Sequence, residues 1–213
     1  MKNKLRKIIR EIIEEEYPSS FDMDFFKSLS SFRSRVEYCK NLLQYIKGGS
    51  SRKVYKINED KVLKLAFNKK GIAQNKVEVQ LGNDSYINYL FTKIYDFDPN
   101  FLWIEAELAQ KVNYTKFKEI LGYSFQDFAD ALQKYNPNSK IDYSIVINKE
   151  TEEAIIDSEF FSDVMDLMSG YKIPVGDLTR ISSYGIVKRN GEEDIVIVDY
   201  GLNQDVQKQY YNV

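Results

Sequence analysis

The stretch GDLTRISSYGIVKRNGEEDIVIVDYG, residues 176–201, decides the fold. An acidic residue stands near each of its ends: Asp177 in Gly-Asp-Leu and Asp199 in Val-Asp-Tyr-Gly. The residues between them fit two short strands, 184–187 and 194–198, joined by Asn-Gly, the dipeptide most typical of a tight hairpin turn. We therefore expect two carboxylates on either side of one β-hairpin.

The 213-residue chain contains no histidine, and this limits the kinds of catalytic and metal-binding site that it can build. Without an imidazole, the chain can build neither a Ser-His-Asp triad nor a histidine-ligated zinc site. Carboxylates, lysines and a bound metal must therefore carry any catalysis. A hairpin flanked by Asp177 and Asp199 suits phosphoryl transfer, which depends mainly on positioning and charge neutralisation.

A second informative stretch lies upstream, where the sequence predicts three strands and a helix. Residues 46–57 fit a strand, a turn of small residues and a second strand, and 61–66 fit a third strand that carries Lys64. Residues 71–81 then fit a helix that carries Glu78. Small side chains at the turn let backbone amides approach an anion. The turn residues are Gly48, Gly49, Ser50 and Ser51.

The order of these features, ending with Asp177 and Asp199, resembles the protein-kinase-like superfamily over about residues 45–202. The Gly-Asp-Leu motif is most similar to its aminoglycoside-kinase-like branch and to small prokaryotic or viral, phage-type branches. The resemblance implies an α+β, two-lobed fold, with a small antiparallel sheet in the N-lobe and a reduced, mostly helical C-lobe. The predicted domains are an N-terminal helix at 1–17, a nucleotide-binding N-lobe with a preceding helix at 18–109, and a C-lobe at 110–213.

The resemblance also implies two cofactors, ATP and Mg²⁺, and a role for each site residue. Lys64 would neutralise the α- and β-phosphates, and Glu78 would hold its ammonium group in place. The turn at 48–51 would cradle phosphate oxygens. Asp177 would be the catalytic base, and Asp199 would hold Mg²⁺.

One further part of the site follows from the resemblance, and two parts depart from the family pattern. Backbone groups near Glu107 and Ala109 would face the adenine edge. Ser182 and Ser183 stand where the family has an asparagine that binds a second metal, and a hydroxyl is a poorer Mg²⁺ ligand than an amide carbonyl. In the turn, only Gly49 matches the family's glycine loop. These departures leave an alternative open: an inactive pseudokinase that serves as a structural or interaction module, for instance of a phage particle.

The remaining elements are predicted from apolar periodicity. Residues 2–16 fit an amphipathic helix that Pro18 ends, and its apolar face predicts a protein partner docking through residues 1–16. Further helices are expected at 22–47, at 114–134 and at 158–168, the last ended by Gly170, and a small hairpin is expected at 141–156.

Composition places the chain among soluble globular proteins, with 43% hydrophobic and 29% charged residues. A formal net charge of −2 argues against nucleic acid as a partner. The single cysteine, Cys39, allows no internal disulfide and suits a reducing cytoplasm. If the chain is viral, the expected location is the host cytoplasm or the virion. No apolar stretch of about 18 residues is present, so no membrane span is expected.

Overall fold

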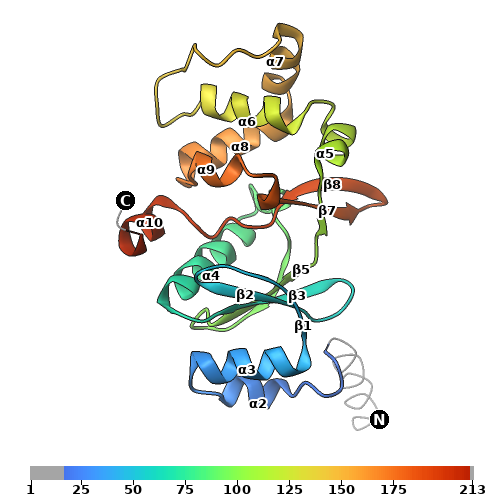
Figure 1. Cartoon of the computed structure of the whole chain (residues 1–213), viewed down its shortest axis with the longest axis vertical. Helices are drawn as coiled ribbons and strands as arrows, with labels where there is room; N and C mark the ends of the chain where they lie inside the picture. The colour runs from blue at the N-terminus through green and yellow to red at the C-terminus, as the bar shows by residue number, and fades with distance from the viewer. Residues whose placement is uncertain (1–16, 212–213) are drawn as a thin grey trace. The chain divides into compact units, whose positions relative to one another are not determined.

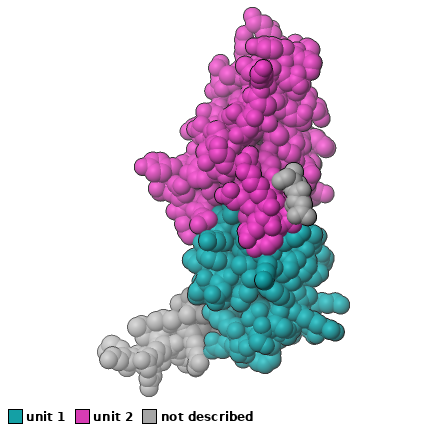
Figure 2. All heavy atoms as spheres, turned by 90° about the vertical axis from the view of Figure 1, so that its left-hand side faces the viewer, with its two compact units in different colours: residues 1–79, 94–108 teal, residues 80–93, 109–213 magenta. Residues whose placement is uncertain are grey.

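The computed structural model describes residues 17–211. Within this range the chain forms two compact units, coloured separately in Figure 2. The first unit contains residues 17–79 and 94–108, and the second contains 80–93 and 109–211. The amphipathic helix predicted at 2–16 lies outside the described residues. The boundaries predicted after residues 17 and 109 stay predictions.

The first unit is a five-stranded antiparallel sheet with helices on both faces (Figure 1). In sheet order, the strands are β1 (Gln44–Gly48), β2 (Arg52–Lys56), β3 (Lys61–Ala66), β5 (Trp103–Glu107) and β4 (Ile94–Phe97). Helices α2 (Met23–Ser28) and α3 (Phe32–Leu42) come before the sheet and lie on one side of it, while α4 (Lys69–Gly82) connects β3 to β4 and lies on the other side.

Strand β3 is buried on both faces, which explains its nearly continuous apolar sequence. Leu63 and Leu65 point into the core beneath α2 and α3. Because side chains alternate along a strand, Lys64 points to the opposite face, where α4 packs. The core beneath α2 and α3 also contains Phe21, Phe26, Cys39, Tyr55 and Trp103.

The helix predicted over 22–47 is wrong in its extent, because this segment forms two helices and a strand. Asp22 and Ser31 each cap a helix, and each side chain accepts a hydrogen bond from a backbone N–H of the first turn. Leu43 is extended, and the residues after it pair with β2 as strand β1. Cys39 of α3 is a free cysteine that lies buried in the core of the first unit.

The second unit is mostly helical and carries a three-stranded sheet. Its helices are α5 (Tyr114–Leu121), α6 (Phe125–Lys134), α7 (Lys149–Ile156), α8 (Glu159–Gly170), α9 (Val175–Leu178) and α10 (Gln204–Tyr210), with 3-10 turns η1 (Asn88–Leu90) and η2 (Ile181–Ser183). Its strands are β6 (Gln110–Lys111), β7 (Tyr184–Arg189) and β8 (Glu192–Ile197). The predicted α+β class, with a small antiparallel sheet first and a mostly helical part after it, is confirmed.

The predicted hairpin between the two aspartates is present as β7 and β8. Asn190 and Gly191 both have positive φ, 53° and 92°, as two-residue hairpin turns that follow strand twist require. The hairpin predicted at 141–156 is wrong: helix α7 occupies 149–156, and the side chain of Asn148 caps it. Gly170 belongs to the last turn of α8 instead of lying beyond it. Among the described helices, none has the length and apolar character needed to cross a membrane.

Candidate active site

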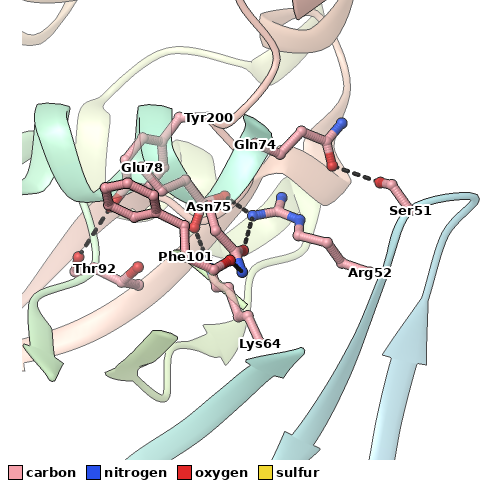
Figure 3. Close-up of polar contacts among 9 residues, drawn as sticks. All are labelled: Ser51, Arg52, Lys64, Gln74, Asn75, Glu78, Thr92, Phe101 and Tyr200. Carbon is pink, nitrogen blue, oxygen red and sulfur yellow. Dashed lines mark hydrogen bonds and ion pairs between the residues drawn. The ribbon is translucent and has the colours of Figure 1, made fainter. Parts of the chain in front are cut away.

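The centre of the candidate site in the first unit is a fully buried carboxylate, Glu78 of α4 (Figure 3). Its Oε2 atom lies 2.6 Å from Nζ of Lys64, which is itself 6% exposed on β3. The ion pair expected between strand lysine and helix glutamate is therefore present. A lysine on an apolar strand often extends its charge to water, but here the charge is turned inward.

A second cation shares the same carboxylate. Nη1 of Arg52, from β2, lies 2.7 Å from Oε1 of Glu78, and the Arg52 side chain is 10% exposed. The Oε1 atom has no aligned hydrogen-bond donor among the described residues, so this contact is chiefly coulombic. Arg52 also donates a longer hydrogen bond, 3.4 Å, to Oδ1 of Asn75. Glu78 thus pairs with one cation from each of two neighbouring strands.

The small-residue turn falls into two parts. Gly48, Gly49 and Ser50 are exposed, and the backbone N–H of Gly49 closes the turn by donating to the carbonyl of Arg52 at 3.0 Å. Ser51 is buried, and its hydroxyl donates to Oε1 of Gln74 on α4 at 2.5 Å. The phosphate cradle predicted for the turn stays a prediction, whereas the Ser51 hydroxyl joins the turn to α4.

In the second unit, Asp177 and Asp199 lie close enough to interact electrostatically. Asp177 belongs to the short helix α9, and Nη1 of Arg180 lies 3.5 Å from its Oδ1. Partial burial raises the pKa of Asp177, the positive charge of Arg180 opposes that rise, and the negative charge of Asp199 adds to it. The hairpin β7–β8 thus separates the two aspartates in sequence, and their charges still act on each other.

The two serines at the second-metal position differ in their surroundings. Ser183 is 6% exposed, and its hydroxyl donates to the backbone carbonyl of Asp177 at 2.6 Å. Ser182 is exposed. Ser183 therefore fixes the loop that carries Asp177. Metal binding by Ser182 and Ser183 stays a prediction.

Sequence reasoning missed the contacts that hold the residue after Asp199. The ring of Tyr200 stacks on Phe91 at a centroid distance of 4.0 Å, and its hydroxyl donates to the carbonyl of Thr92 at 3.4 Å. Arg189, at the end of β7, donates to the carbonyls of Tyr89 and Phe91 at 2.8 and 2.7 Å. These contacts tie the Asp199 loop to the segment that follows α4.

Glu107 and Ala109 lie at the point where the chain leaves the first unit. Glu107 is the last residue of β5, and the N–H of the next residue, Leu108, donates to the carbonyl of Asp60 at 2.7 Å. That amide is thus engaged within the unit. The predicted adenine contact by the backbone of Glu107 and Ala109 stays a prediction.

The donor set fits a magnesium ion held partly by substrate. No group of three or more acidic or cysteine side chains that could hold a metal occurs in residues 17–211. Mg²⁺ commonly binds through one or two carboxylates and completes its shell with phosphate oxygens and water. Asp199, whose side chain is exposed, would supply one such carboxylate.

The first unit has three features of a kinase-like N-lobe. It has a five-stranded antiparallel sheet, a helix between the third and fourth strands in sequence, and a buried Lys–Glu pair that joins sheet and helix. The chain is similar to several solved structures, at low sequence identity. An ADP-bound aminoglycoside phosphotransferase APH(2'')-Ib has 14% identity and a TM-score of 0.34, over 80% of this chain and 69% of that one. The streptomycin–ATP complex of APH(2'')-IIa has 13% identity and a TM-score of 0.35, over 85% and 71%.

Choline kinase LicA from Streptococcus pneumoniae has 14% identity and a TM-score of 0.34, over 80% of this chain and 69% of that one. No family model matches the chain, and no curated protein matches it by sequence. Similarity at this level carries no inference about activity, which must come from the residues of this chain.

Proposed function

We propose that the chain binds Mg²⁺–ATP and transfers the γ-phosphate to a hydroxyl acceptor. The observation that carries the proposal is the buried Lys64–Glu78 ion pair on β3 and α4. Buried ion pairs add little stability compared with well-packed apolar residues, because desolvation offsets most of the attraction. A pair retained at this position is better explained by a lysine that must be aimed at an anion.

Each residue then has a defined task in the reaction. The exposed turn at 48–50 and Lys64 hold the triphosphate. Asp199 would hold the metal, which would supply further neutralisation of the phosphate charge. Asp177 takes the proton of the acceptor hydroxyl, and the oxygen of that hydroxyl bonds to the γ-phosphorus. The bond between the γ-phosphorus and the bridging oxygen breaks, and ADP leaves with that oxygen. Its raised pKa, caused first by burial, makes the Asp177 carboxylate a stronger base than an exposed aspartate.

Thermal unfolding tests the proposal directly. Mg²⁺–ATP should raise the melting temperature of the wild type, because a ligand that binds only the native state stabilises it by mass action. Lys64→Ala and Asp199→Ala should each abolish this rise, while Lys76→Ala, which removes an exposed lysine of α4, should retain it. A wild type whose melting temperature does not change at millimolar Mg²⁺–ATP would refute nucleotide binding.

The second candidate function is an inactive pseudokinase that acts as a structural or interaction module. It is favoured by Ser182 and Ser183, which stand at the position of the family's second metal ligand and offer only hydroxyls, poorer Mg²⁺ ligands than an amide carbonyl. The two candidates differ in turnover. An active enzyme hydrolyses or transfers the γ-phosphate of bound ATP, and Asp177→Asn abolishes this turnover without loss of binding, whereas a pseudokinase shows binding at most.

We further propose that residues 1–16 dock onto a protein partner, since their apolar stripe would otherwise be exposed. Deleting them should leave the nucleotide-induced rise in melting temperature unchanged and should alter the oligomeric state or partner capture, measured by light scattering or pull-down. Unfolding of the whole domain after the deletion would show that these residues belong to its core.

A further inference from the structure

We propose that Arg52 is a positioning residue that frees Lys64 to engage phosphate. This inference rests on the proposed function, because it assigns to Arg52 a task within nucleotide binding. Arg52 sits at the start of β2, directly after the small-residue turn, and its guanidinium lies beside the buried carboxylate of Glu78.

Lys64 needs Arg52 because a buried charge without a partner costs free energy. If Lys64 were the sole partner of Glu78, turning its ammonium toward phosphate would leave a fully buried carboxylate uncompensated. Breaking a buried ion pair in this way is strongly unfavourable, and that penalty would oppose nucleotide binding. Arg52 removes the penalty, because its guanidinium stays charged at all relevant pH values and remains beside Glu78.

The surroundings of Arg52 hold it in place for this task. Asn75, which is fully buried on α4, accepts from Arg52 through Oδ1 and donates through Nδ2 to the carbonyl of Phe101 at 2.9 Å. The neighbouring hydrogen bond from Ser51 to Gln74 joins the same strand to the same helix. Figure 3 shows these side chains converging between β2 and α4. Arg52 thus has a fixed position and is not a mobile surface cation.

The arrangement predicts which step depends on Arg52. Without it, Lys64 is held more tightly by Glu78, and the site also loses one positive charge near the triphosphate. Both effects weaken the binding of phosphate, and neither changes the reacting groups Asp177 and Asp199. The effect should therefore appear in the affinity for nucleotide and not in the rate constant of the bound complex.

The experiment measures Mg²⁺–ATP binding by titration calorimetry, well below the melting temperature, for four proteins. Arg52→Gln should raise the dissociation constant on the order of tenfold, the size typical of coupling between two sites. Arg52→Lys should recover part of the loss, because it restores charge without the guanidinium fork. Lys53→Gln is the matched control, since it removes the same charge from the next residue, whose ammonium lies over the rings of Tyr45 and Phe67 on the other face of the sheet.

Three results would separate the possible explanations. Equal weakening by Arg52→Gln and Lys53→Gln would overturn the proposal, because general loss of positive charge would then suffice. A lower melting temperature of Arg52→Gln with an unchanged dissociation constant would also overturn it, since Arg52 would then serve stability alone. Absence of binding by the wild type itself would refute the proposed function, and is thereby distinguished from failure of this inference. If Arg52→Gln does not fold, Arg52→Lys against Lys53→Gln provides the same comparison.

Discussion

Replacing Glu78 with glutamine should destabilise the protein strongly, even though the two side chains have nearly the same shape. The substitution removes the carboxylate that pairs with Lys64 at 2.6 Å and with Arg52 at 2.7 Å. Both cations would then remain buried beside a neutral amide. Removing one partner of a buried pair costs about 3–5 kcal/mol. For a chain of this length, each kcal/mol lowers the melting temperature by about 2–4 °C, so we expect a fall of about 6–20 °C.

The assay is thermal unfolding of the ligand-free protein followed by circular dichroism. Glu37→Gln is the matched control, because Glu37 forms an exposed ion pair with Arg33 at 3.6 Å and its side chain is 62% exposed. Exposed pairs of this kind contribute about 0.2–1 kcal/mol. If Glu78→Gln and Glu37→Gln lowered the melting temperature equally, the buried carboxylate would not be the anchor of the first unit.

The remaining predictions concern the carboxylate pair, the packing of α4 and the Asp199 loop. Arg180→Ala should raise the pKa of Asp177 further, because it removes the positive charge that lowers it. Since the base must be ionised, the acidic limb of the pH–rate profile should move to higher pH, with Arg33→Ala as the unshifted control. The same raised pKa means that the stability contributed by Asp177 falls as pH rises through the interval between its unfolded and folded pKa values. Gly71→Ala should cost about 1–3 kcal/mol in urea unfolding, because its Cβ would clash with the Ser51 carbonyl and lie 2.9 Å from the Ala66 Cβ. Gly170→Ala, whose Cβ would meet no atom within 4 Å, should cost nothing. Arg189→Ala should cost about 1.5–3 kcal/mol by the same measurement, because it removes the donors to Tyr89 and Phe91, whereas Lys188→Ala on the exposed side should be neutral.

The sequence was sufficient to predict the parts of the site that follow from local order. Lys64 lies in a strand and Glu78 in the next helix, and a connection of this kind packs the helix back onto the sheet. A lysine and a glutamate on the facing sides then meet by geometry. The hairpin between the aspartates was equally predictable, because Asn-Gly supplies the positive φ values that the turn requires.

The elements that could not be predicted depend on capping and on pairing between distant residues. In the 22–47 segment, Ser31 reads as one more polar residue on a helix, and only its cap hydrogen bond shows that a new helix begins there. Residues 141–148 contain apolar residues that fit a strand, yet Ile141, Tyr143 and Val146 are exposed. No partner strand for them is present within the described residues, and a strand pattern without a partner does not form a hairpin.

Arg52 shows where register, more than composition, decides a residue's role. Strands β2 and β3 pair so that Val54 faces Lys64 and Arg52 faces Ala66. Alternation then places Arg52 on the same face as Lys64, one diagonal step away, whereas Lys53 points to the opposite face. A slip of one residue would exchange the two cations and leave Glu78 with a single partner. The turn between β2 and β3 is therefore part of the site's construction, because it fixes which of two adjacent cations is buried beside the carboxylate.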